Sequence, residues 1–164
     1  MVRVLHFIQK SEVRKYDIQT VKFELEVNEH IFPPSPHGSF FAENMRINAG
    51  ESVIDIGTGS GFLGILAAKL GGKVSATDND ADAINLARKN AARNNISIDF
   101  QQGEYFANFK ENFDVIVVNL PQEIVHENYQ KAICEQLTKS FDGGSDGNKP
   151  VLQFLDLAKQ YMHN

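Results

Sequence analysis

Residues 52–68 read Ser52-Val-Ile-Asp-Ile-Gly-Thr-Gly-Ser-Gly-Phe-Leu-Gly-Ile-Leu-Ala-Ala68, and this stretch decides the fold of the chain. The apolar run Val53–Ile56 predicts a buried strand, and Phe62–Leu70 continues with the spacing of a helix. Between them lies the alternating turn Gly57-Thr-Gly-Ser-Gly61. Glycine allows positive φ and lets a ligand approach the backbone without meeting a Cβ, so this strand–turn–helix unit predicts a nucleotide-binding turn.

Composition and charge fit an ordinary globular domain. The chain has 164 residues, of which 42% are hydrophobic and 23% are charged, and its formal net charge is −5. It therefore has no overall positive field that would hold a phosphate backbone. The single cysteine, Cys134, excludes an internal disulfide and a cysteine-based zinc site, and the histidines show no metal-ligand spacing. The sequence has no signal-peptide pattern and no apolar run of membrane-spanning length, which predicts a cytoplasmic protein.

Strands and helices alternate after the glycine turn. The pattern predicts strands over Lys73–Asp78, Ile96–Phe100 and Phe113–Asn119 and helices over Asp80–Asn95, over Glu123–Phe141 and from about Lys149. The first of these helices carries Asn90 within its apolar stripe. The alternation predicts an α/β fold: a Rossmann-like, doubly wound, mostly parallel sheet with right-handed crossovers and helices on both faces.

An N-terminal arm, residues 1–35, is predicted to precede a core of residues 36–164. The predicted elements here are strands over Val2–Ile8 and Val21–Val27 and a helix over Ser39–Ile47. The proline-rich stretch Phe32–Gly38 interrupts regular structure, because proline cannot donate to a hydrogen-bond ladder. It is predicted to be either a linker or a segment that closes over a ligand.

Two ligand classes use a glycine turn of this kind. Gly59-Ser-Gly-Phe-Leu-Gly64 matches the dinucleotide pattern G-x-G-x-x-G, which predicts a small NAD-binding Rossmann protein. The frame Asp55-Ile-Gly-Thr-Gly-Ser-Gly61 instead resembles motif I of the class I S-adenosylmethionine-dependent methyltransferases. A carboxylate in that position can orient the α-ammonium group of S-adenosylmethionine, whereas it would repel a pyrophosphate. The methyltransferase interpretation is therefore preferred.

Further candidate residues lie at the carboxyl ends of the predicted strands, where open α/β sheets bind their ligands. Asp78 ends the second core strand, where a carboxylate can bind the ribose hydroxyls; its alternative role is a helix N-cap. Glu104 follows the third strand, where the family often places an acid or amide against the adenine amino group; its alternative is an exposed loop residue. The resemblance implies S-adenosylmethionine as cofactor, bound by Asp55, Gly57, Thr58, Gly59, Gly61, Asp78, Asn79, Glu104 and Asn119.

The tetrapeptide Asn119-Leu-Pro-Gln122 resembles the Asn-Pro-Pro-Tyr motif of methyltransferases that act on planar nitrogen. The resemblance implies that Asn119, Leu120 and Pro121 form the catalytic turn. The Asn119 oxygen and the Leu120 carbonyl would accept hydrogen bonds from the substrate NH₂ group and align its nitrogen with the methyl donor. Leu120 replaces a proline of the motif and Gln122 replaces its aromatic residue. An ordinary turn at the end of a strand is the alternative.

Two more segments narrow the resemblance. Phe141–Gly147 resembles the Gly-Gly-x-Asp-Gly segment of protein-(glutamine N5) methyltransferases and their nucleobase-modifying relatives, and Ile31–Pro36 resembles their proline-rich segment. The implied function is methyl transfer to a protein glutamine amide or a nucleobase amine, with a protein or a nucleic acid as partner. A non-catalytic S-adenosylmethionine-binding module is the alternative, because the catalytic motif is altered.

The end of the chain differs from the pattern of that family. Methyltransferases of this kind continue with a fifth strand, a helix and an antiparallel hairpin, and no run after Phe113–Asn119 has the pattern of a strand. We therefore expect a fold whose C-terminal strands are missing, with an open edge beside Val115–Val118; the alternative is an edge covered by the strand Val2–Ile8 or by a second subunit.

Overall fold

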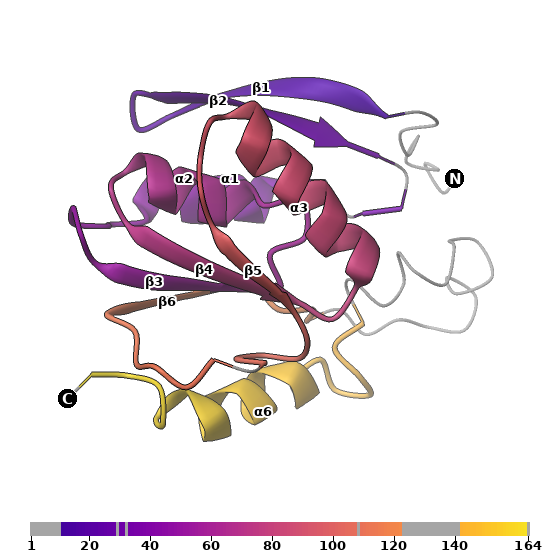
Figure 1. The fold of residues 1–164 in the computed structure, drawn as a ribbon. Helices are drawn as coiled ribbons and strands as arrows, with labels where there is room; N and C mark the ends of the chain where they lie inside the picture. Colours follow the sequence, from indigo (N-terminus) through magenta and orange to yellow (C-terminus); the bar gives the residue numbers. More distant parts are fainter. Residues whose placement is uncertain (1–10, 29, 32, 108, 123–141, 164) are drawn as a thin grey trace, which may run out of the picture.

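The computed structural model describes residues 11–28, 30–31, 33–107, 109–122 and 142–163. Its main sheet has four parallel strands in the order β5-β4-β3-β6 (Figure 1). These strands are β3 (Ser52–Ile56), β4 (Lys73–Asp78), β5 (Asp99–Gln102) and β6 (Val115–Val118). The helices are α1 (Pro36–Asn44), α2 (Phe62–Lys69), α3 (Ala81–Arg93) and α6 (Lys149–Ala158). This architecture confirms the predicted Rossmann-like α/β fold.

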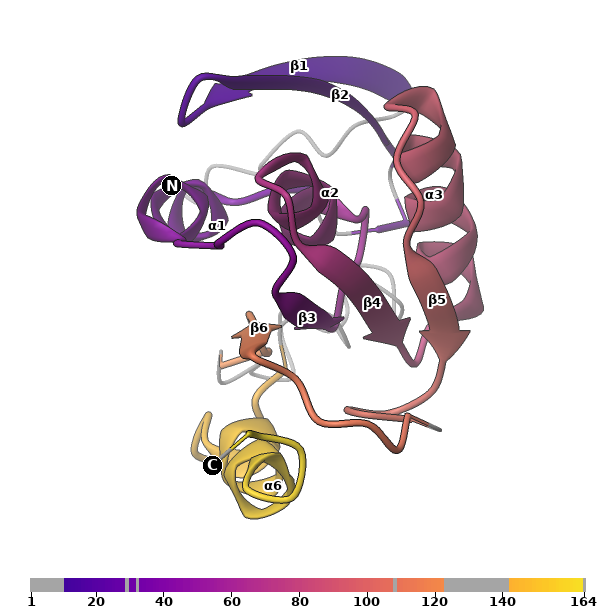
Figure 2. The same cartoon turned by 60° about the vertical axis from the view of Figure 1, so that its left-hand side comes forward.

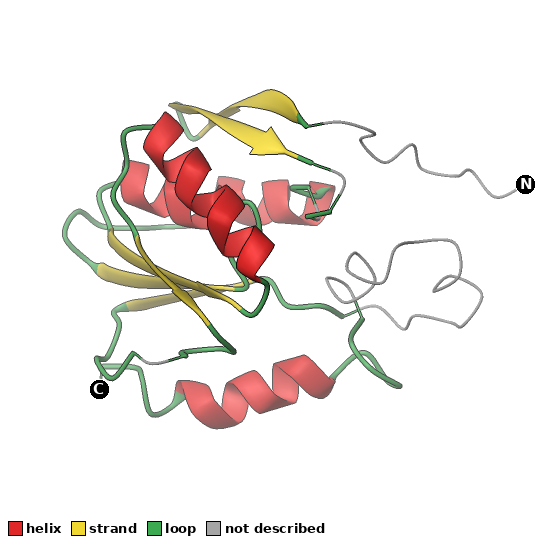
Figure 3. Cartoon of the chain, turned by 45° about the vertical axis from the view of Figure 1, so that its right-hand side comes forward, coloured by secondary structure: helices red, strands yellow, loops and turns green. Residues whose placement is uncertain are grey.

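The helices cover both faces of the sheet. Helices α1, α2 and α3 lie on one face and α6 lies on the other (Figures 2 and 3). The central strand β3 explains why both faces need cover, because its side chains alternate between them. Val53 packs into the cluster on the side of α2, whereas Ile54 and Ile56 pack into the cluster on the side of α6. All three side chains are buried, as expected for a central parallel strand.

A hairpin of β1 (Glu12–Ile18) and β2 (Val21–Val27) forms a separate two-stranded antiparallel sheet above the helices (Figures 1 and 3). Its turn residues Gln19 and Thr20 have φ of 51° and 70°, the positive values that a tight hairpin turn uses. Apolar residues of β2 belong to the same buried cluster as residues of α2. The described part of the predicted arm therefore packs against the core, and the domain boundary at residue 35 stays a prediction.

The predicted strand Val21–Val27 is confirmed over the same residues, and β1 was not predicted. The residues of β1 that pair with the buried positions of β2 are Tyr16, Arg14 and Glu12, two of them charged, so Glu12–Ile18 shows no apolar alternation. The predicted strand Val2–Ile8 and the predicted helix Glu123–Phe141 lie outside the described residues.

Helix α1 and strand β5 differ from their predicted bounds: α1 ends at Asn44 rather than Ile47, β5 ends at Gln102 rather than Phe100, and both starts also differ. Helix α1 begins at Pro36 rather than Ser39, because Ser35 caps it by accepting a hydrogen bond from the Gly38 amide at 3.1 Å. Strand β5 begins at Asp99 rather than Ile96. Asn95 has φ of 56°, and the Ile96 amide donates to the Ala91 carbonyl at 2.9 Å, so residues 95 and 96 form the capping turn that follows α3.

Among the described residues no strand lies on the outer side of β6, and the alternative cover, Val2–Ile8, is not among them. In the described part of the chain, Val115–Val118 pair with β3 alone. Immediately before them, Phe113 forms an isolated parallel bridge with Met162 and donates its amide to the Tyr161 carbonyl at 2.8 Å. The segment after α6 thus returns to the sheet beside β6. None of the described helices has the length and hydropathy to cross a membrane.

Candidate functional site

The parallel sheet brings the predicted site residues to one edge, because the carboxyl ends of its four strands lie together (Figure 1). Backbone hydrogen bonds join these ends directly. The amides of Gly57 and Thr58 both donate to the Thr77 carbonyl at 2.9 Å, and the Gly103 amide donates to the Asp78 carbonyl at 2.9 Å. The loops after β3, β4 and β5 therefore form one hydrogen-bonded unit.

Asp55 holds the glycine turn to the start of α2. Its side chain is 2% exposed, and its Oδ2 accepts hydrogen bonds from the Thr58 hydroxyl at 2.6 Å and from the Gly64 amide at 2.9 Å. A Cβ on Gly64 would lie 3.0 Å from the same oxygen, so glycine is what lets the helix approach the carboxylate this closely. Asp55 thus has a structural role in the turn, and its contact with a cofactor stays a prediction.

Asp78 holds the other side of the turn. Its Oδ2 accepts a hydrogen bond from the Gly59 amide at 2.9 Å, and its Oδ1 accepts one from the Asp80 amide at 3.0 Å. Asp80 is itself the N-cap of α3, accepting from the Asp82 amide at 2.8 Å. Asp80, not Asp78, therefore caps α3, and Asp78 holds the glycine turn instead.

The two carboxyl groups lie on adjacent strands and share an unusual electrostatic setting. Burial, with a smaller contribution from the nearby Asp78, raises the pKa of Asp55 to about 6, against the opposing effect of the hydrogen bonds from Thr58 and Gly64. Burial also raises the pKa of Asp78, while the amides of Asp80 and Gly59 lower it. Negative charge is thus already costly at this turn, which makes it a poor site for a further anion.

The glycine turn leaves room for a ligand. Gly57 and Gly59 have φ of 70° and 54°, in the region that favours glycine. Among the described residues, an ideal Cβ on Gly57 would have no heavy atom within 4 Å, and one on Gly59 would meet only Cγ2 of Ile31, at 4.0 Å. A side chain at either position would occupy space that the protein's own atoms leave open.

Glu104 lies at the same edge of the sheet, in a loop that hydrogen bonds hold in place. Its side chain is exposed, and its carbonyl accepts the Ala107 amide at 2.8 Å. The next residue, Tyr105, has φ of 48° and is held from both sides: its carbonyl accepts from the Thr77 hydroxyl, and its own hydroxyl donates to the Gln153 Oε1 of α6 at 3.0 Å. The neighbouring candidate Asn79 is also exposed, and its carbonyl accepts from the Gln102 amide group at 3.2 Å.

The Asn119 turn sits beside the N-terminus of α1. Asn119 is exposed, and Leu120 and Pro121 are half-buried. An ideal Cβ on Gly38 would lie 3.8 Å from the Asn119 Nδ2, so the capped first turn of α1 packs next to this side chain. The proline-rich segment thus leads directly to the site. An ideal Cβ on Gly143 would lie 2.9 Å from the Gln122 carbonyl carbon, which places the glycine-rich segment against the same turn.

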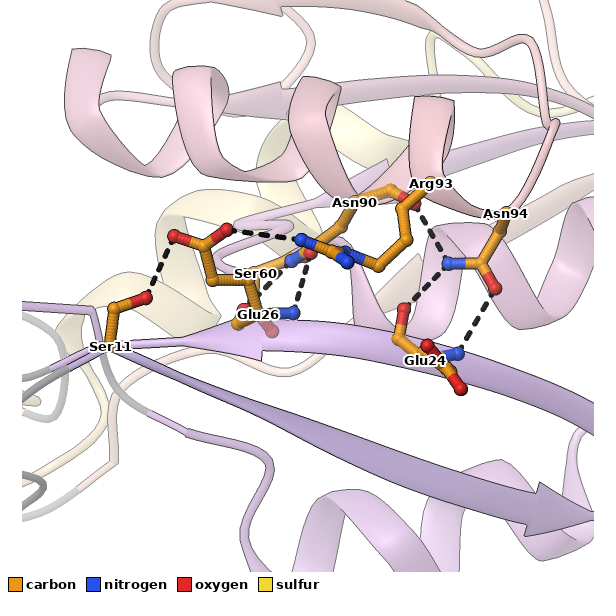
Figure 4. Close-up of polar contacts among 7 residues, drawn as sticks. All are labelled: Ser11, Glu24, Glu26, Ser60, Asn90, Arg93 and Asn94. Atoms are coloured by element: carbon orange, nitrogen blue, oxygen red, sulfur yellow. Dashed lines mark hydrogen bonds and ion pairs between the residues drawn. The ribbon is translucent and has the colours of Figure 1, made fainter.

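The structure adds Asn90, a residue that the sequence placed only in an apolar stripe. Its side chain is fully buried, and its Nδ2 donates to the Ser60 carbonyl of the glycine turn at 2.9 Å (Figure 4). The signal was present in the sequence, because an asparagine among buried alanines and leucines needs hydrogen-bond partners. What the sequence could not show is that one of them is the turn itself.

Comparison with known proteins decides the family. The profile of the family described as "Ribosomal protein L11 methyltransferase (PrmA)" matches residues 36–140. The chain belongs to this family. The match spans the glycine turn, Asp78, Glu104 and Asn119, and it sets aside the NAD-binding alternative.

Relatives of this PrmA-family chain carry more than one substrate name. A ribosomal protein L11 methyltransferase of Dictyoglomus thermophilum is 44% identical over 80 residues, which cover 48% of this chain and 27% of the relative. A Methanocaldococcus jannaschii protein assigned as a protein N5-glutamine methyltransferase is 30% identical over 146 residues, covering 88% and 73%. A release factor glutamine methyltransferase of Streptococcus pneumoniae is 36% identical over 104 residues, covering 59% and 37%.

Solved structures support the same fold. The ribosomal protein L11 methylase of Lactobacillus delbrueckii subsp. bulgaricus matches with a TM-score of 0.50 and 30% identity, covering 70% of this chain and 47% of that one. The Thermus thermophilus 16S rRNA N2 G1207 methyltransferase, solved with AdoMet and guanosine, matches with a TM-score of 0.69 and 17% identity, covering 94% and 40%. At that identity the likeness shows the fold alone. The PrmA-family chain spans about a quarter of its Dictyoglomus relative and about half of the Lactobacillus protein.

Proposed function

We propose that this chain is an S-adenosylmethionine-dependent N-methyltransferase acting on a planar nitrogen. One observation carries the proposal: the glycine turn and the first turn of α2 donate amides inward, from Gly59 to Asp78 and from Gly64 to Asp55. A turn built to bind a pyrophosphate keeps such amides for the ligand. Here Asp78 and Asp55 already accept the hydrogen bonds of these amides, so the turn favours a ligand that brings a cation and hydroxyl groups.

The residues present fit S-adenosylmethionine. Space over Gly57 and Gly59 admits a ligand against the backbone. Asp78 and the exposed Asn79, at the end of β4, would bind the ribose hydroxyls, and the exposed Glu104, in the loop after β5, would bind the adenine amino group. When bound, S-adenosylmethionine supplies an electrophilic methyl group carried on a sulfonium centre.

The Asn119 turn would hold the methyl acceptor. The side-chain oxygen of Asn119 and the backbone carbonyl of Leu120 are neutral acceptors that can bind both hydrogens of an NH₂ group. Accepting from both fixes the plane of that group, and the gain comes from alignment rather than from an acid or a base. The first turn of α1, packed beside Asn119, limits the directions from which an acceptor can enter.

A protein glutamine is the acceptor that we favour over a nucleobase amine. The formal net charge of −5 gives no general attraction for a phosphate backbone. Two relatives carry names that specify glutamine, and one of them is covered over 73% of its length. The two acceptors present similar planar NH₂ groups, so the experiment must separate them.

The proposal is tested in two steps on the purified chain. Calorimetric titration with S-adenosylmethionine, with NAD as the control ligand, should show binding of the first alone. Radiolabelled methyl transfer into cell extract, with protein and nucleic acid fractions counted separately, should then label protein, and Asn119→Ala should lower the label. Label in nucleic acid would replace the favoured acceptor. Binding without any transfer would establish the non-catalytic module, and absence of binding would refute the assignment.

A further inference from the structure

One buried amide joins the N-terminal hairpin to the glycine turn. Asn90 lies in the second half of α3 and is 0% exposed. Its Oδ1 accepts from the Glu26 amide of β2 at 2.7 Å, and its Nδ2 donates both to the Glu26 carbonyl and to the Ser60 carbonyl at 2.9 Å (Figure 4). Three elements that are distant in the sequence therefore meet at a single side chain.

Asn94, one helical turn later, supplies a natural comparison. Its Oδ1 accepts from the Glu24 amide at 3.0 Å, and its Nδ2 donates to the Glu24 carbonyl at 2.6 Å. Its remaining bond is to the Asn90 carbonyl at 2.8 Å, within its own helix. Both asparagines thus grip the backbone of β2 in the same way, but only Asn90 continues to the glycine turn.

The turn depends on this contact for its shape. Ser60 is 4% exposed and stands between two glycines, whose backbone conformations are the least restricted in the segment. The Gly59 amide is fixed by Asp78, and Gly61 packs against Ala87 of α3, with its ideal Cβ position 3.3 Å from the Ala87 Cα. The Ser60 carbonyl between them is held by Asn90.

We propose that Asn90 is a positioning residue that couples docking of the hairpin to the ligand-binding shape of the glycine turn. The inference rests on the proposed binding of S-adenosylmethionine at that turn. If β2 leaves Asn90, the amide loses both partners on Glu26 and is opened to water, which then competes with the Ser60 carbonyl for the side chain. A second link acts in the same sense, because Ile31, four residues beyond β2, lies over Gly59.

Coupling of this kind is reciprocal. A ligand that requires the ordered turn must also stabilise the docked hairpin. Loosening the hairpin at Glu26 must lower the affinity for that ligand by the same factor. Loosening the hairpin at Glu24 should have little effect on the ligand, because Asn94 has no bond to the turn. The two asparagines therefore separate general hairpin docking from positioning of the turn.

The test compares Asn90→Ala with Asn94→Ala. Each variant removes two hydrogen bonds to β2, so we expect similar losses in urea-unfolding stability. S-adenosylmethionine affinity, measured by calorimetry, should fall about tenfold for Asn90→Ala and less than about twofold for Asn94→Ala. In the wild-type chain, a saturating concentration of the ligand should slow amide exchange at Glu26 by about tenfold and at Glu24 by less than about threefold. The exchange measurement stands even where Asn90→Ala does not fold.

Each outcome is decisive. Wild-type binding with equal affinity losses in the two variants, or with equal protection at Glu24 and Glu26, would overturn the inference and leave the proposed function standing. Failure of the wild-type chain to bind S-adenosylmethionine would overturn the proposed function and the inference with it.

Discussion

The glycine turn after β3 and the Asn119 turn after β6 lie at the same edge of one sheet, yet the protein holds them very differently. Three side chains hold the glycine turn: Asp55 bonds Thr58, Asp78 bonds the Gly59 amide, and Asn90 bonds the Ser60 carbonyl. The side chain of Asn119 is exposed and has the backbone of α1 beside it. The half of the site that would bind the cofactor is thus shaped in advance, and the half that would bind the acceptor presents exposed groups.

That difference predicts separable effects of substitution. Changes in the glycine turn should act on cofactor binding and on the fold. Changes at Asn119 should act on transfer alone. Four substitutions, from the largest expected effect to the smallest, can break or sharpen this division.

Gly59→Val should abolish measurable S-adenosylmethionine binding, a loss of more than about a hundredfold in affinity. The valine would place its side chain in the open space over the turn, and it would strain a backbone that has φ of 54°. Gly50→Val is the matched control. Gly50 has φ of 89° and no heavy atom within 4 Å of its ideal Cβ, so it suffers similar strain far from the site. Equal affinities for the two variants would show that the turn is not the binding surface.

Asp78→Ala should weaken cofactor binding by about 1.5–3 kcal/mol, or roughly 10- to 150-fold, the range for a hydrogen bond to a charged group. The change removes the carboxylate proposed for the ribose and frees the Gly59 amide. Asp99→Ala, at the amino end of β5, removes an exposed charge from the opposite edge of the sheet and should leave affinity unchanged. Calorimetry on both variants shows whether cofactor affinity depends on the position of the lost charge or on the total charge of the protein.

Asn119→Ala should lower turnover by more than about tenfold, equivalent to 1.4 kcal/mol of barrier, while cofactor affinity changes little. The side chain is proposed to hold the acceptor and makes no contact that shapes the glycine turn. Asn112→Ala, just before the same strand, serves as the control because Asn112 is also exposed. A parallel fall in affinity and turnover would mean that the two turns are not separable.

Asp55→Asn should flatten the pH dependence of stability. Burial raises the pKa of folded Asp55 from 3.8 to about 6, so protonation favours the folded state and the stabilisation is lost as pH rises through 6. Between pH 5 and pH 7 the wild-type chain should lose about 1 kcal/mol of unfolding free energy from this group, from about 1.4 kcal/mol per pKa unit. The variant should lack this loss, while the raised pKa of Asp78 continues to act in the same direction. Urea unfolding at both pH values measures the difference.

The control for this measurement is Asp114→Asn. The hydrogen bonds from Ser52 lower the pKa of Asp114, so this group is ionised in both states above pH 5. Its replacement should leave the slope between pH 5 and pH 7 unchanged. An unchanged slope in Asp55→Asn would show that Asp55 is not the titrating group.

The predictable part of the structure is the part where local and global signals agree. Strands β3 and β4 and helix α2 follow the sequence pattern closely, because buried apolar runs and glycines determine them locally. Helix α1 was misplaced by three residues, although Ser35 followed by Pro36 is a readable N-cap with proline in the first turn. The capping pattern therefore predicts the start of α1 correctly.

The rest depends on contacts between distant segments. Strand β1 has mostly charged residues and is specified by its pairing with β2, so its own sequence carries little signal. Asn90 was visible as a polar residue in an apolar stripe, but its partners come from residues 26 and 60. Likewise, packing of Gly38 beside Asn119 joins α1 to the end of β6 through the fold alone. The roles proposed for the site residues stay predictions until they are measured.

Through Asn90 and Asn94, the α3 segment also bonds the backbone of β2 at two points, as a neighbouring strand would. Residues four apart on a helix are separated by about 6 Å along its axis, and residues two apart on a strand by about 6.8 Å. Two contacts, or rungs, between the helix and the strand therefore match in spacing within about 1 Å. The mismatch grows with every further rung, and position 86, one turn before Asn90, is a leucine. A ladder of this type is therefore short by geometry. Inserting a single residue between Asn90 and Asn94 would rotate one rung by about 100° away from β2, so this helix should tolerate substitutions on its outer face but no change in length between the rungs.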